Sequence, residues 1–308
     1  MVTRSIAALD VPVALPARTA RSTVISGYWV LTKPEVNFLI VITTFAGFYL
    51  GRSAGWRDFP VWLLVNTLWG TLLVASGTGT LNQYLERRFD AEMRRTARRP
   101  LAAGRLKPAA VLWFGVALSV FGCVYLAVVV NVLASLLAIA TLLSYLLLYT
   151  PLKRKTPLCT LVGAFPGAVP PLIGWAAASG RLNFQAFTLY AILFLWQFPH
   201  FMAIAWMYRE DYARAGYLVL PPGPYARARL IHLQTVLPLL ALEPLSLLPA
   251  WMGGAKVYGI ATFLLDVGFL YYAARFVICK SNAVARQLLA ASITYLPAIF
   301  VVMVLARG

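Results

Sequence analysis

Long apolar runs dominate this sequence and are the feature that most constrains its fold. A helix that crosses a bilayer core of about 30 Å needs about 20 mostly apolar residues. Only 12% of the residues are charged, whereas a soluble domain carries about 25%. Nine apolar runs are bounded by charged or turn residues, at 36–50, 61–81, 109–130, 132–149, 158–178, 184–207, 230–250, 257–278 and 287–306. The sequence therefore predicts an all-α, polytopic membrane protein with nine transmembrane helices.

The basic residues alternate with these runs, although a net charge of +17 could by itself suggest nucleic acid. Of the 27 lysines and arginines, 22 fall on one side of the predicted membrane. The positive-inside rule places that side in the cytoplasm. We therefore expect no nucleic-acid partner, residues 1–35 as a cytoplasmic N-terminal tail, a membrane domain at 36–308 and a C-terminus outside. The expected location is the cell inner membrane.

The carboxylates cluster, which is the first indication of function. Five of the ten lie in two cytoplasmic segments, namely Glu86, Asp90, Glu92, Glu210 and Asp211. Asn82, Glu86 and Asp90 are spaced by four residues, which puts three oxygen ligands on one helix stripe at steps of about 6 Å. Magnesium favours carboxylates combined with substrate phosphate oxygens. The stripe indicates a magnesium–diphosphate site, and a solvated helix end with ordinary charge pairs is the alternative.

A basic turn and a second acidic motif face the same side. The turn contains Tyr149, Lys153, Arg154 and Lys155, and its lysines and arginine are suitable donors to phosphate oxygens. Positive-inside anchoring explains Lys155 equally well, but it does not explain Tyr149. The second motif, Glu210-Asp211, follows the sixth run.

Together, the Asn-x-x-x-acid-x-x-x-Asp motif, the Tyr-x-x-x-Lys motif and the second acidic motif resemble the UbiA-type intramembrane prenyltransferase superfamily. Longer strings resemble its protoheme farnesyltransferase (heme O synthase) family, at 82–105, 149–157, 167–175 and 196–201. Two positions depart from the superfamily pattern. Glu86 stands where Asp is more usual, and Ala215 stands where a second Asp is found.

The resemblance implies a helical fold around a central cavity and transfer of a farnesyl group from farnesyl diphosphate to a vinyl group of heme B. The product, heme O, would serve heme–copper oxidases, with heme A synthase or an oxidase-assembly factor as a possible partner. It further implies Mg²⁺ held by Asn82, Glu86, Asp90, Glu210 and Asp211. Arg99, Lys153 and Arg154 would bind diphosphate, and Tyr149, Lys153, Asp90 and Asp211 would take part in catalysis.

Three other functions are compatible with parts of the sequence. Another UbiA-type enzyme would act on a quinone or chlorophyll precursor. A secondary transporter would carry ionisable residues near mid-membrane, and Glu243 and Asp266 within the seventh and eighth runs fit that pattern. A structural respiratory subunit would not need two facing acidic motifs.

His200 lies inside the sixth run, where a titratable ring needs a partner. On a regular helix the eleven residues to Asp211 bring both side chains to one face, about 16 Å apart along the axis. We therefore expect His200 to contact or ligate heme iron. The alternative is a neutral ring that is hydrogen-bonded to a helix carbonyl left free by Pro199.

Overall fold

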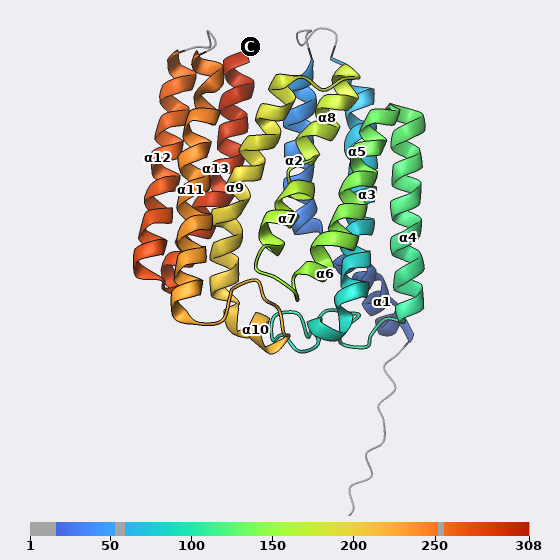
Figure 1. Cartoon of the computed structure of the whole chain (residues 1–308). Helices are drawn as coiled ribbons and strands as arrows, with labels where there is room; N and C mark the ends of the chain where they lie inside the picture. The colour runs from blue at the N-terminus through green and yellow to red at the C-terminus, as the bar shows by residue number, and fades with distance from the viewer. Residues whose placement is uncertain (1–16, 53–58, 252–255, 308) are drawn as a thin grey trace, which may run out of the picture.

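The computed structural model describes residues 17–52, 59–251 and 256–307, and all regular secondary structure in these ranges is helical (Figure 1). Nine segments of these ranges are long and apolar enough to cross a membrane. They are α2 (Pro34–Gly51), α3 (Val61–Asp90), α4 with η2 (Pro108–Tyr125, Leu126–Val130), α5 with η3 and α6 (Val132–Leu143, Ser144–Tyr149, Thr150–Leu152), α7 with α8 (Cys159–Gly167, Pro170–Ser179), α9 (Phe184–Met207), α11 (Pro224–Trp251), α12 (Lys256–Cys279) and α13 (Asn282–Arg307). The predicted all-α membrane fold is confirmed.

The predicted N-terminal tail is partly helical and packed. Residues 1–16 lie outside the described residues, but α1 (Ala17–Leu31) is a helix whose last residue is fully buried. Leu31 packs with Leu101, Leu106 and Val111, and its carbonyl accepts a hydrogen bond of 2.9 Å from Gln83 Nε2. Apolar side chains on the short helix α1 thus anchor the start of α2 beside the end of α3.

The fifth span consists of two helices that meet at a break. Pro166 lies inside α7, and Pro170 begins α8. Because proline lacks an N–H and clashes with the preceding turn, it interrupts a helix in this way. α8 packs closely on α2 through glycine: a Cβ at Gly47 would overlap the backbone of Pro171, and one at Gly174 would overlap the backbone of Thr44. Small residues allow such a close approach between membrane helices.

A buried polar network joins the three C-terminal helices. Asp266 on α12 accepts hydrogen bonds of 2.6 Å from Ser246 on α11 and from Tyr295 on α13. Buried carboxylates need such donors. Asp266 therefore has a place in helix packing, whereas the sequence suggested a transport site.

The elements with acidic or basic motifs lie at one end of the helices. The C-terminal end of α3 lies near α6 and α10 (Arg209–Arg214), while the C-terminus is at the opposite end (Figure 1). The motifs therefore share one end of the molecule.

Candidate functional site

The predicted stripe on α3 is a row of three polar side chains, each in contact with a different base. Asn82, Glu86 and Asp90 are all buried, although they lie at the end of a long helix. The contacts are Lys33 Nζ to Asn82 Oδ1 (3.1 Å), Lys153 Nζ to Glu86 Oε1 (2.8 Å) and Arg99 Nη1 to Asp90 Oδ2 (2.7 Å). Charge-assisted hydrogen bonds offset part of the cost of burying these groups. The row brings carboxylate and amide oxygens together with three basic side chains in one place.

Sequence reasoning missed Lys33, which it counted only among the basic residues of the N-terminal tail. Lys33 lies just before α2 in a left-handed conformation (φ 52°, ψ 59°), and its side chain reaches Asn82 on α3. Burial lowers the pKa of Lys33 to about 7, and the positive charges of Arg99 and Lys153 act in the same direction. Three basic side chains thus surround the stripe, and an anion bound among them would favour the charged form of Lys33.

Lys153 and Tyr149 form the second part of the site. Lys153 Nζ lies 4.6 Å from the centroid of the Tyr149 ring. Burial opposes the charge of Lys153, but the neighbouring Tyr149 and Glu86 raise its pKa well above the ordinary value, so it stays protonated. Tyr149 ends the π-helical segment η3, a conformation often found at functional sites. Gly163 on α7 leaves room for the ring, because a Cβ there would overlap it.

The chain after α10 returns to the basic turn. Gly216 has φ +68°, which glycine adopts without strain, and Leu218 N donates to Lys153 O at 2.7 Å. Between them lies Tyr217, whose hydroxyl is buried close to Glu86. Burial, together with the negative charge of Glu86, raises the pKa of Tyr217. Tyr217 is therefore a protonated donor close to the stripe, and sequence reasoning gave it no role.

Asp211 contacts the loop between α3 and α4. Its Oδ1 and Oδ2 accept hydrogen bonds from the backbone amides of Arg94 (3.2 Å) and Arg95 (3.1 Å). Arg214 Nη1 lies 3.1 Å from Oδ1. These donors use most of the lone pairs of the carboxylate. In this arrangement Asp211 holds the loop that leads to Arg99.

Glu210 and Arg154, the other two predicted site residues, differ in their distance from the stripe. The Glu210 side chain is 78% exposed and lies 3.6 Å from Arg209, so it points away from the stripe. The Arg154 guanidinium lies 4.1 Å from the centroid of Phe89, on the last turn of α3. Arg154 is therefore at the edge of the site, and Glu210 is outside it.

The stripe fits a magnesium ion that is bound together with a diphosphate. Asp90 Oδ1 is buried and has no hydrogen-bond partner among the described residues, which leaves one oxygen for an external ligand. Across residues 17–52, 59–251 and 256–307, no three His, Cys, Asp or Glu side chains are grouped to hold a metal by themselves. Magnesium commonly uses one or two carboxylates and completes its shell with phosphate oxygens and water.

His200 does not have the predicted relation to Asp211. α9 ends at Met207, and Tyr208 (φ −107°, ψ 19°) leads into the separate helix α10. The regular-helix argument that put both side chains on one face was therefore wrong. His200 Nδ1 lies 2.8 Å from Ser292 Oγ on α13, so this ring nitrogen has a hydroxyl as its partner and not the helix carbonyl of the alternative interpretation.

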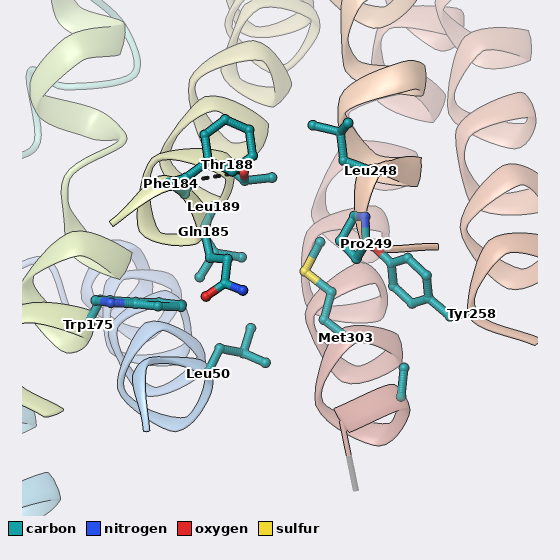
Figure 2. A pocket seen from close by; sticks show the side chains of 11 residues that line it. Leu50, Trp175, Phe184, Gln185, Thr188, Leu189, Leu248, Pro249, Tyr258 and Met303 are labelled. Carbon is teal, nitrogen blue, oxygen red and sulfur yellow. Dashed lines mark hydrogen bonds between the residues drawn. The ribbon is translucent and has the colours of Figure 1, made fainter. Parts of the chain in front are cut away.

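A separate cavity of about 340 Å³ lies between α9 and the C-terminal helices (Figure 2). It is at the end away from the stripe, because it includes Leu50 near the end of α2 and Phe184 at the start of α9. Its lining residues are Leu50, Trp175, Phe184, Gln185, Thr188, Leu189, Leu248, Pro249, Tyr258, Met303 and Ala306. Since none of these side chains is charged, the cavity is unsuited to a diphosphate.

Comparison with known proteins gives agreeing results. The model of the UbiA prenyltransferase family matches residues 40–296. The protoheme IX farnesyltransferase of Solibacter usitatus (strain Ellin6076) is 47% identical over 290 residues, which cover 91% of this chain and 98% of the relative. An apo UbiA homolog from Aeropyrum pernix K1 has a TM-score of 0.66 at 19% identity and covers 87% of this chain and 98% of its own. A UbiA homolog from Archaeoglobus fulgidus, bound to DMAPP and Mg²⁺, has a TM-score of 0.54 at 15% identity, with 90% and 98% covered.

Proposed function

The chain belongs to the UbiA prenyltransferase family, and on this basis we propose that it transfers a farnesyl group from farnesyl diphosphate to a vinyl group of protoheme, making heme O. The observation that carries this proposal is the 47% identity to a protoheme IX farnesyltransferase over nearly the full length of both chains. The row of oxygen ligands on α3 and the basic side chains paired with them would bind the diphosphate.

The chemistry requires no nucleophile from the protein. The bond between C1 of the farnesyl group and the diphosphate oxygen breaks, and the vinyl group supplies the electron pair for the new carbon–carbon bond. Water adds to the resulting cation and loses a proton, while diphosphate leaves. The protein must stabilise the leaving charge and restrict water, which electrostatic preorganisation in an apolar helix bundle achieves.

The contacts suggest a division of roles at the diphosphate. Asn82, Glu86 and Asp90 would hold Mg²⁺, which supplies charge neutralisation when it is bound. Lys33, Lys153 and Arg99 would bind the phosphate oxygens, with Arg154 at the edge. Tyr149 would lie near the reacting carbon, with Lys153 Nζ over the face of its ring.

Asp211 would act through the loop that it holds. We expect Asp211→Asn to lower activity by about tenfold, because a loosened loop misplaces Arg99, the partner of Asp90. The Mg²⁺ concentration that gives half-maximal activity should remain unchanged. A Mg²⁺ titration of the purified variant measures both quantities, and a higher Mg²⁺ requirement would instead show that Asp211 is an ion ligand.

We further propose a location in the cell inner membrane with the N-terminus in the cytoplasm, since 22 of the 27 basic residues fall on that side. The C-terminus and the motif-bearing α10 lie at opposite ends of the helices (Figure 1). An alkaline phosphatase reporter fused after Gly308 should therefore be active, because this enzyme requires the oxidising periplasm. An inactive reporter on a stable fusion protein would contradict this orientation.

Heme analysis tests the function directly. The chain is expressed in a bacterial host that lacks its own heme O synthase. The extracted hemes are separated by chromatography, and their masses are measured by mass spectrometry. We expect heme with an added hydroxyethylfarnesyl group. Unmodified heme alone from well-expressed, folded protein would reject the proposal, and a new prenylated quinone or chlorophyll precursor would assign the chain to another branch of its family.

A further inference from the structure

Ser292 on α13 contacts two side chains of α9 at once. Trp196 Nε1 donates to the main-chain oxygen of Ser292 at 2.8 Å, and His200 Nδ1 lies 2.8 Å from Ser292 Oγ. Trp196 and His200 are four residues apart, and their rings stack with centroids 4.7 Å apart at 26°. Ser292 is fully buried. The two α9 rings are thus held against α13 by one residue.

The position of the serine proton determines which nitrogen of His200 carries hydrogen. Ser292 Oγ also lies 2.7 Å from the carbonyl oxygen of Leu289. A carbonyl only accepts, and a serine hydroxyl has one proton, so that proton lies between Ser292 and Leu289. Nδ1 must then donate to Ser292 Oγ. A neutral imidazole has one N–H, which leaves Nε2 with a free lone pair.

Nε2 of His200 has no hydrogen-bond partner among the residues that the structure describes. The ring is only half-buried, and it lies between Trp196 and the edge of Phe201, whose centroid is 5.5 Å away. Metal-ligating histidines commonly have this arrangement, in which a hydrogen bond at one ring nitrogen fixes the tautomer and the other nitrogen binds the metal.

We propose that Ser292 is a positioning residue, which holds His200 in the Nδ1–H tautomer and thereby presents Nε2 to the iron of the heme substrate. This inference rests on the proposed function for the identity of the metal. The tautomer itself rests only on the contacts of Ser292, so the two parts can be tested separately.

The tautomer can be measured without heme. The chain has only two histidines, and His232 is exposed on α11. A His232→Gln protein labelled with ¹³C and ¹⁵N in histidine therefore reports His200 alone by solid-state NMR in lipid bilayers. We expect hydrogen on Nδ1 and a bare Nε2 near neutral pH. A ring that carries its hydrogen on Nε2 would overturn the inference, whether or not the chain proves to be a farnesyltransferase.

Three variants then test the role of the hydroxyl in heme binding. Ser292→Ala should lose the fixed tautomer and weaken heme binding by about 10- to 100-fold, as expected for an outer-shell partner of a metal ligand. Ser292→Thr keeps a hydroxyl and should restore most of the affinity. Thr294→Ala is the matched control, because Thr294 is exposed two residues further along the same helix.

The Ser292→Ala substitution spares the helix contact, since Trp196 bonds to the backbone oxygen, which alanine retains. Heme titration of purified protein, followed by its optical spectrum, is the measurement. Ser292→Ala with the affinity and spectrum of the parent would refute the positioning role. If the parent binds heme with a spectrum that His200→Ala does not change, then His200 is not the ligand, and the error lies in the metal assignment and not in the tautomer.

Discussion

Asp90→Asn should lower farnesyl transfer by at least about two orders of magnitude. Asp90 is 2% exposed, and one of its oxygens lies 2.7 Å from Arg99. The other oxygen is buried and has no hydrogen-bond partner in the part of the chain that the structure describes. Asparagine preserves the shape but removes the charge that would hold Mg²⁺ against the leaving diphosphate. Loss of one preorganised electrostatic group commonly costs about 100- to 1000-fold in turnover. The measurement is the rate of heme O formation by purified enzyme at saturating substrates.

Glu210→Gln is the matched control for this experiment. It makes the same chemical change at a carboxylate that is 78% exposed and points away from the stripe, so it should keep nearly full activity. Because Asp90 is buried, equal amounts of folded protein must be compared, as judged by gel filtration in detergent. Folded Asp90→Asn protein with parental turnover would remove Asp90 from the mechanism.

Lys153→Met should have an effect of similar size, about 100-fold or more on transfer, through loss of a phosphate-binding cation. Its Nζ lies 2.8 Å from Glu86, which is 6% exposed. The variant therefore also leaves a buried carboxylate unpaired, and breaking a buried ion pair in this way can cost about 3–5 kcal/mol of stability. Activity and folding yield must be separated.

The double variant Glu86→Gln/Lys153→Met makes that separation, because it removes both charges of the pair. We expect it to recover folding yield but not activity. Lys155→Met is the matched control, since Lys155 is an exposed lysine in the same turn and should be dispensable. If Lys155→Met and Lys153→Met reduce turnover equally, the turn provides general membrane anchoring and Lys153 has no specific role.

The sequence predicted the membrane fold and the stripe well, because both depend on short-range periodicity. Run length alone located the nine spans of the described residues, six of them to within three residues, although α3 continues to Asp90, nine residues beyond the predicted end. Four-residue spacing placed Asn82, Glu86 and Asp90 together on α3. Lys33 was missed because its contact is with Asn82, which is 49 positions further along the chain. That contact depends on the start of α2 lying beside α3. In the sequence, a lysine before an apolar run that anchors a helix cannot be distinguished from one that faces a binding site.

The acidic residues outside the stripe show a second limit of sequence reasoning. Glu210 and Asp211 are neighbours in the chain, yet one is exposed and the other accepts two backbone amides. Only the break at Tyr208 and the path of the following loop decide which of them turns inward. Asp266 likewise suggested transport until its donors on two neighbouring helices were identified.

Each polar group on the α3 stripe is already paired with a basic side chain. Binding of the substrate would therefore replace these internal pairs with contacts to the substrate. A magnesium diphosphate would take Lys153 and Arg99 away from Glu86 and Asp90 and give the carboxylates the metal in return. The number of strong contacts then changes little between the resting and loaded states, so the net gain on binding is moderate. When diphosphate is released, the internal pairs can form again and compete with it for the same cations. The stripe would thus act as a tethered competitor of the leaving group. We expect metal-free pyrophosphate to bind more tightly to variants whose own carboxylates are neutralised but whose lysine and arginine remain.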